Sequence, residues 1–167
     1  MIRPVSGLAA LLALVGCAAT PVPTAAPVTL AAPVTLAAQT CRLIDGRADS
    51  RCTPGAINPA VTQDNIHSTV CVPGWTDKVQ PAADYAAALK LRQMRDFGEG
   101  SPQNYKEDHL IPLSLGGAPT DPKNLFPQPT AKTTEKEDLE DRLHQSVCSG
   151  QLPLTAAQAQ MRRDWAR

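Results

Sequence analysis

The chain has 167 residues, and its 16 lysines and arginines are balanced by 16 aspartates and glutamates, so its formal net charge at pH 7 is zero. This balance argues against a broad basic surface for nucleic acid and leaves room only for a small local basic patch. Nearly all of the charge lies after residue 40. We therefore expect one domain of about 127 residues over 41–167, which is long enough to bury one modest core.

The first 16 residues have the features of an export signal. Arg3 precedes an apolar stretch over residues 8–15, which is too short to remain as a membrane-spanning helix. The stretch ends in the residues LVGC at 14–17, which resemble the bacterial lipobox, where the signal is cut before a cysteine that receives lipid. The resemblance implies lipidation of Cys17 and, because Ala18 follows it, sorting to the outer membrane. The alternative is an ordinary secretory signal that leaves Cys17 without a role.

Residues 17–40 differ in composition from the rest of the chain. They are rich in alanine, proline, threonine and valine, carry no charge, and repeat the hexapeptide APVTLA at 26–31 and 32–37. Prolines at this density deny the backbone regular hydrogen bonding. The segment is therefore predicted to be an extended tether, with an edge strand of the fold as the alternative.

Four cysteines lie in the expected domain: Cys41, Cys52, Cys71 and Cys148. An even number of cysteines in an exported chain indicates disulfides, and four cysteines allow three pairings. We favour a local bridge between Cys41 and Cys52 and a long-range bridge between Cys71 and Cys148. A zinc site built from these cysteines is the rival, but the Cys-x-x-Cys spacing typical of zinc sites is absent from the sequence.

The first half of the domain begins with an irregular segment. Turn signals such as Asp-Gly, Pro-Gly and Asn-Pro fill residues 41–60. The β-branched residues of 66–72 predict a short strand. A helix is predicted over 81–97, because a proline lies near its start and Gly98 follows its end.

The second half is predicted to form a hairpin and two helices, which makes the domain α+β. Residues 110–115 and 124–128 are expected to be the two arms of the hairpin. The first helix has capping-box spacing at Thr134 and Glu137, and the second has it at Thr155 and Gln158. Apolar residues spaced for one helical face follow in each: Leu139, Leu143 and Val147 in the first, and Met161 and Trp165 in the second.

The segment 105–148 contains EDHLIPL at 107–113, two glycines at 116–117 and NLFPQ at 124–128. This pattern resembles the HNH (ββα-metal) endonuclease superfamily and, more closely, a group of small exported bacterial proteins that carry an HNH-like block. The closer resemblance extends from Cys52 to Trp165. It implies a disulfide-stapled domain with a hairpin–helix core that binds a metal and hydrolyses phosphodiester bonds.

The chemistry of Asp108 and His109 agrees with that resemblance. Histidine is the natural general base near neutral pH, and aspartate is a hard oxygen ligand for a divalent cation. Adjacent side chains of an extended segment point to opposite faces, so the two can act together only where the backbone bends. The resemblance implies such a loop, held by hydrogen bonds from Asn124. The alternative is a structural pair that caps the edge of the hairpin.

The sequence departs from the HNH pattern at the position of a further metal ligand. At the positions where HNH enzymes usually have this ligand, the chain has Lys132 and Thr133, which do not suit the role. Glu135 and Glu137 are the candidates instead, although Glu137 also fits the capping box. Mg²⁺ is the expected ion, with Mn²⁺ or Zn²⁺ as alternatives. Lys132 and Lys136 are candidates for contacts with substrate phosphates.

Two further side chains receive the more ordinary interpretation. His144 is expected at the surface, and Glu107 is expected to be a neighbouring support or a solvated charge rather than a ligand.

These features predict a metal-dependent nuclease of the cell envelope. It would cleave DNA or RNA with little sequence selectivity, because no element for reading bases is visible. It would be anchored to the membrane through Cys17 and would need no obligate protein partner. The alternative is a non-catalytic envelope lipoprotein that keeps the HNH-like scaffold for binding or structure. The missing helix ligand and the zero net charge favour this alternative.

Overall fold

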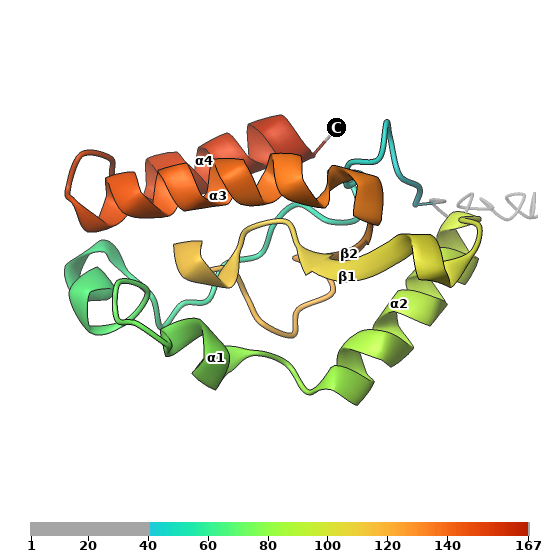
Figure 1. Ribbon diagram of the computed structural model, residues 1–167, viewed down its shortest axis with the longest axis horizontal. Coiled ribbons are helices and arrows are strands. Elements are labelled where there is room, and N and C mark those ends of the chain that lie inside the picture. The colour runs from blue at the N-terminus through green and yellow to red at the C-terminus, as the bar shows by residue number, and fades with distance from the viewer. Residues whose placement is uncertain (1–40, 167) are drawn as a thin grey trace, which may run out of the picture. The chain divides into compact units, whose positions relative to one another are not determined.

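The computed structural model describes residues 41–166 (Figure 1). The predicted export signal, the lipidation site Cys17 and the tether all fall on residues 1–40, outside the described residues. In the described part, helices surround one antiparallel sheet of two strands, so the α+β class is confirmed. The elements are α1 (Trp75–Val79), α2 (Ala83–Phe97), β1 (Tyr105–His109), β2 (Leu125–Pro129), α3 (Thr133–Cys148) and α4 (Leu154–Trp165). Short 3₁₀ helices span Gln63–Ser68, Pro102–Asn104, Leu113–Leu115 and Thr130–Lys132.

The hairpin pairs β1 with β2, with Tyr105 opposite Pro129 and His109 opposite Leu125. The second arm agrees with the prediction to within one residue. The first arm does not: residues 110–115 are not a strand. Leu110 and Ile111 are fully buried in the core, and the chain turns at Pro112 into a 3₁₀ helix. The mostly apolar residues 110–115, here called the core plug, therefore fill the core after the strand has ended. The strand itself consists of the more polar residues Tyr105–His109.

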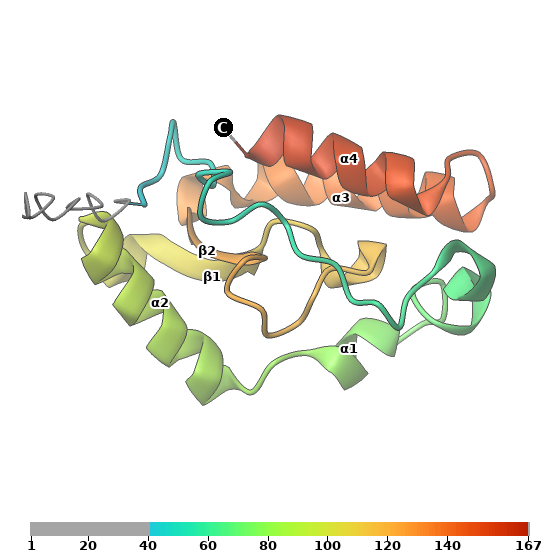
Figure 2. The ribbon, with the colours of Figure 1, turned by 180° about the vertical axis from the view of Figure 1, so that it is seen from behind.

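Helix α2 confirms the prediction for 81–97. It ends where Gly98 adopts a left-handed conformation, with φ of 71°, which glycine tolerates without strain. Leu89 and Met94 are buried on its inner side. The hairpin lies between α2 and α3 in both views (Figures 1 and 2), so its two faces are covered by different helices.

The strand predicted over 66–72 is wrong. Residues Gln63–Ser68 form a 3₁₀ helix instead, held by the side chain of Asn65. Its Oδ1 accepts from the backbone N–H of Thr62 at 2.8 Å, and its Nδ2 donates to the carbonyl of Ala60 at 2.9 Å. A side-chain amide that bonds to nearby backbone in this way competes with strand pairing. The side chain of Ile66 is therefore buried in the core, but it comes from a helical turn and not from a strand.

Helices α3 and α4 lie side by side (Figures 1 and 2) and bury the apolar stripes predicted for them. Both predicted capping boxes are wrong. Helix α3 begins at Thr133, so Thr134 lies inside its first turn, and α4 begins directly after Pro153. Gln158 is buried and donates its Nε2 to the carbonyl of Leu115 at 2.9 Å, which ties α4 to the core plug.

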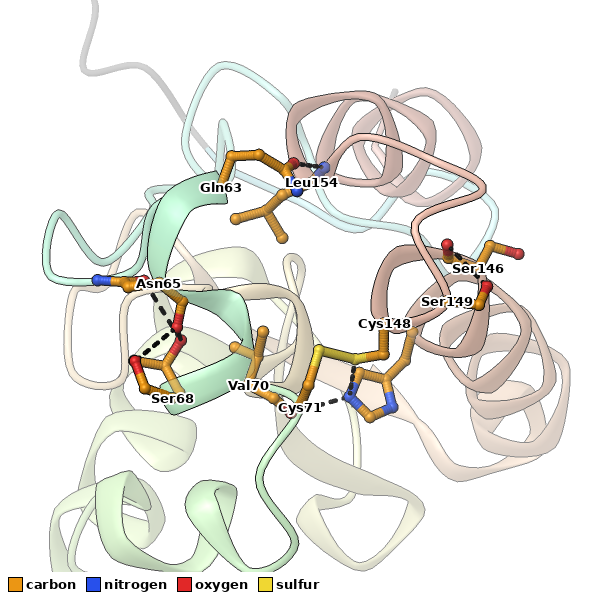
Figure 3. Close-up of a disulfide and its surroundings, with 11 residues drawn as sticks. Gln63, Asn65, Ser68, Val70, Cys71, Ser146, Cys148, Ser149 and Leu154 are labelled. Atoms are coloured by element: carbon orange, nitrogen blue, oxygen red, sulfur yellow. Dashed lines mark hydrogen bonds between the residues drawn. A yellow bond between two sulfur atoms is a disulfide. The ribbon is translucent and has the colours of Figure 1, made fainter.

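Both favoured disulfides are present. Cys41 and Cys52 are 11 residues apart in sequence, and their Cα atoms are 5.9 Å apart. Cys71 and Cys148 are 77 residues apart, with their Cα atoms 5.6 Å apart. Figure 3 shows this second bridge joining the chain after Val70 to the end of α3. The long bridge therefore closes a covalent ring that contains α1, α2, the hairpin and α3.

Removing each bridge should cost stability according to the length of chain that it closes. Replacing Cys71 and Cys148 together by serine is expected to lower the free energy of unfolding by about 4 kcal/mol. The same change at Cys41 and Cys52 is expected to cost about 3 kcal/mol, because a shorter bridge restrains the unfolded chain less. Urea unfolding followed by circular dichroism measures both. A larger loss for the short bridge would contradict this explanation.

Candidate active site

A pocket of about 250 Å³, here called the hairpin pocket, lies at the end of β1 and receives both Asp108 and His109. Because His109 is the last residue of the strand, the turn that follows lets the two neighbouring side chains line the same pocket. Helix α1 with the residue that follows it, the core plug and α3 complete the walls. The lining residues are Thr76, Gln80, Lys106, Asp108, His109, Pro112, Leu113, Ser114, Glu137 and Glu140.

The imidazole of His109 is held in one tautomer. Its Nε2 lies 2.9 Å from the carbonyl oxygen of Pro119. A carbonyl can only accept a hydrogen bond, so Nε2 carries the proton and Nδ1 is the basic nitrogen. Burial lowers the pKa of His109 below its ordinary value of 6.5, although the Pro119 carbonyl and Asp108 oppose the effect. At neutral pH this side chain is a neutral base.

Asp108 is paired with a buried lysine. Its Oδ2 lies 2.9 Å from Nζ of Lys136, and the Lys136 side chain is only 2% exposed. Lys136 therefore lies beneath Asp108, where it neutralises that carboxylate, and it does not present its charge to a substrate as the sequence analysis expected. Its position explains the burial, because it lies three residues before Leu139 and so belongs to the apolar stripe of α3.

Glu140 also lines the pocket, although no sequence motif pointed to it. It lies one turn after Lys136 on α3, and its Oε1 accepts a hydrogen bond of 2.6 Å from Oγ of Ser114. Burial raises its pKa, and the charge of Lys136 lowers it only in part. The pocket thus holds a histidine whose pKa is lowered and a glutamate whose pKa is raised, both mainly by burial, and such perturbed groups in one pocket mark a candidate functional site. The sequence signal that could have revealed Glu140 is its position four residues after Lys136, which places both side chains on one face of the helix.

Asn124 holds the loop that shapes the pocket. The residue is completely buried, and its Oδ1 accepts from the backbone N–H of Ile111 at 2.8 Å. Its Nδ2 donates to the carbonyls of Ile111 at 2.9 Å and Ala118 at 3.0 Å. Gly117 permits this close approach, because a Cβ there would lie 1.8 Å from the Ile111 carbonyl oxygen. Asn124 is thus a positioning residue and does not face the pocket.

Of the remaining residues predicted to bind metal or substrate phosphate, one lines the pocket and two lie outside it. Glu137 lines the pocket and pairs with Lys106 at 2.9 Å. Glu135 does not line it: its two oxygens contact Lys132 at 3.1 Å and Arg47 at 3.5 Å. Lys132 is therefore engaged with Glu135 away from the pocket.

Glu107 faces the other side of the hairpin. Within the described residues, both of its carboxylate oxygens are buried without a hydrogen-bond partner. Burial, followed by the charge of Asp108, raises its pKa to about 8, while Lys90 and Arg92 of α2 oppose the shift. Glu107 is therefore buried against the side of the hairpin that α2 covers, which excludes it as a ligand in the pocket.

The arrangement of the predicted metal ligands does not form a ready cation site. Asp108, Glu135 and Glu137 each pair with a lysine or arginine. Across residues 41–166, three ligand atoms from histidine, cysteine or carboxylates gather within 4.8 Å of one another only at Cys71, His144 and Cys148. In this arrangement the hairpin pocket does not fit a bound divalent cation, because Lys136 and Lys106 already pair with Asp108 and Glu137, and Glu140 is hydrogen-bonded to Ser114.

No family model, curated protein or solved structure matches the chain. The case for a function therefore depends on the pocket and its side chains.

Asn124→Ala is expected to lower the free energy of unfolding by about 2 to 4 kcal/mol, because it removes three buried hydrogen bonds and leaves backbone groups of the loop unpaired. Asn104→Ala is the matched control, since Asn104 is exposed, and it should change the free energy by less than about 0.5 kcal/mol. Urea unfolding measures both, and equal effects of the two variants would contradict the role assigned to Asn124.

Proposed function

We propose that this domain is an HNH-like phosphodiester hydrolase of DNA or RNA, with its active site in the hairpin pocket. One observation carries the proposal. The contact of His109 with the Pro119 carbonyl leaves Nδ1 as the basic nitrogen, in a pocket that also holds a glutamate with a raised pKa. The resemblance of the segment 105–148 to HNH enzymes supports the substrate class.

The pocket residues divide the proton transfers between them. Nδ1 of His109 takes a proton from water as the water oxygen attacks phosphorus, and Glu140 gives a proton to the oxygen that leaves. The bond between phosphorus and the leaving oxygen breaks, so atoms and charge balance. Lys106 contributes positive charge at the pocket wall. Burial alone would lower its pKa, but Asp108 and Glu137 raise it overall, so it stays charged.

A divalent cation is implied by the resemblance, and when bound it would polarise the phosphate. For Asp108 and Glu137 to hold Mg²⁺, their ion pairs with Lys136 and Lys106 would have to break. The proton transfers proposed for His109 and Glu140 do not depend on that exchange. We therefore propose cleavage without a required metal, and the metal-dependent form becomes an outcome of the test.

Little sequence selectivity is proposed, because the pocket is small and the chain has no net charge with which to hold a long stretch of nucleic acid.

A second candidate function is a non-catalytic binding or structural module. The observation that favours it is the pairing of Asp108, Glu135 and Glu137 with cationic side chains, which gives each carboxylate a structural role.

The location proposed for the protein is the cell envelope, with a lipid anchor at Cys17 and no obligate protein partner. Two disulfides in the domain support export, since disulfides persist in oxidising compartments. In residues 41–166, every helix falls short of the length and apolar character that crossing a membrane requires. The proposed attachment therefore depends on the lipobox-like residues at 14–17.

The proposal predicts that His109→Ala reduces cleavage by at least about 100-fold, because the variant loses its general base. The full chain is incubated with plasmid DNA and with single-stranded RNA, each with a chelator or with Mg²⁺ or Mn²⁺. His67→Ala is the matched control, since His67 is exposed outside the pocket, and it should cleave like the unchanged chain.

The chelator separates the possibilities. Cleavage that persists with the chelator and disappears in His109→Ala supports the proposal. Cleavage that stops with the chelator would establish the metal-dependent form instead. A chain that cleaves neither substrate under any condition would favour the binding module.

The rate should also depend on pH through His109. Only the neutral imidazole can accept a proton, so activity should fall as pH drops through the His109 pKa. Because burial lowers that pKa, the half-maximal rate on the acidic side should lie below pH 6.5. Initial cleavage rates from pH 4 to pH 8 measure this limb. A midpoint well above 6.5 would mean that another group controls the rate.

A further inference from the structure

A second cluster of reactive side chains surrounds the long disulfide, about which the proposed function says nothing. His144 and Cys148 lie one helical turn apart on α3, so their side chains share a face. Nε2 of His144 is 3.4 Å from Sγ of Cys148 and 2.9 Å from the carbonyl oxygen of Val70. Cys71 completes a group whose three ligand atoms lie within 4.8 Å of one another. His144, expected at the surface, is half-buried and is engaged by its contacts with Val70 and Cys148.

We propose that reducing the Cys71–Cys148 bridge turns this group into a Zn²⁺ site. Two thiolates and one imidazole form a ligand set that zinc binds with a water molecule in the fourth position. Such soft sulfur and nitrogen donors favour Zn²⁺ over Mg²⁺, which prefers oxygen. In the oxidised chain the two sulfurs are bonded to each other and no thiolate is available, so the site exists only after reduction.

The chemistry of the conversion balances. A dithiol reductant gives two electrons and two protons to the S–S bond, which breaks to leave two thiols, and the reductant becomes a disulfide. Zn²⁺ then displaces the two thiol protons. The imidazole binds through Nε2, whose proton is released while Nδ1 takes one up, so the ring stays neutral. The hydrogen bond to Val70 is given up in exchange for the bond to the metal.

The surrounding packing favours a preformed site. Val70 and Val147, the chain neighbours of the two cysteines, are 3% and 0% exposed and belong to the core. Because both valines are packed in the core, we expect the two backbones to stay close to each other after the bridge opens. Two thiolates on one tetrahedral zinc lie about 3.8 Å apart at the usual Zn–S distance, so the sulfurs need to separate by only a small side-chain rotation.

The other disulfide provides an internal comparison. In the described part of the chain, Cys41 and Cys52 do not share such a group with a histidine, a third cysteine or a carboxylate. Only the long bridge is therefore expected to bind zinc when it is reduced. The metal would then replace the covalent link between the chain around Val70 and α3.

The test measures Zn²⁺ binding by the full chain before and after reduction with a phosphine, which takes the oxygen of water and becomes a phosphine oxide. The oxidised chain should bind no Zn²⁺ at this site. The reduced chain should bind one Zn²⁺ there in competition with a chromogenic chelator. His144→Ala should weaken binding by at least about tenfold. His67→Ala and the double change Cys41→Ser with Cys52→Ser should bind like the unchanged chain.

A second readout reports the ligands directly. Co²⁺ in place of Zn²⁺ should give a thiolate-to-metal charge-transfer band in the reduced chain, and the band should vanish when Cys71 and Cys148 are both serine. Three results would each overturn the proposal: no metal bound by the reduced chain, equal affinity in His144→Ala, or equal affinity of the reduced chain in urea. The last result would show that loose thiols, rather than a built site, hold the metal.

Discussion

The geometry of the hairpin pocket depends on one buried side-chain amide. Asn124 bonds to both backbone groups of Ile111 and to the carbonyl of Ala118, and so closes the loop between β1 and β2. The next residue, Pro119, then offers its carbonyl to His109. A buried amide in the core thus positions the carbonyl that fixes which nitrogen of the His109 imidazole carries the proton.

Local chemistry allowed several parts of this fold to be predicted from sequence. Gly98 marks the end of α2 because only a residue without a side chain takes its left-handed conformation easily. The disulfide pairing favoured among the three possible ones is present. The hydrogen bonds of Asn124 to the loop agree with the role that the HNH resemblance, rather than local chemistry, implied for it. The first hairpin arm was misplaced because the apolar residues Leu110 and Ile111 look like a strand in sequence, whereas the fold uses them to fill its core. Hydrophobicity indicates burial, but it does not distinguish a strand from a plug.

The site residues that sequence reasoning misjudged are charged groups on a buried helix face. Lys136 and Glu140 lie on the stripe of α3 that also carries Leu139 and Leu143, and charged side chains are ordinarily assigned to solvent. Their partners, Asp108 and Ser114, come from the strand and the core plug more than twenty residues earlier. Periodicity within one helix reveals which face is buried, but it cannot reveal a partner that only the tertiary fold brings near.

The ring closed by Cys71 and Cys148 encloses the hairpin, three helices and every residue assigned to proton transfer. A peptidase that cuts once anywhere inside this ring leaves two pieces joined through sulfur, so the nicked protein remains one molecule around its pocket. In a compartment where hydrolytic enzymes are abundant, such a domain loses its integrity only when a second cut or a reductant follows the first cut.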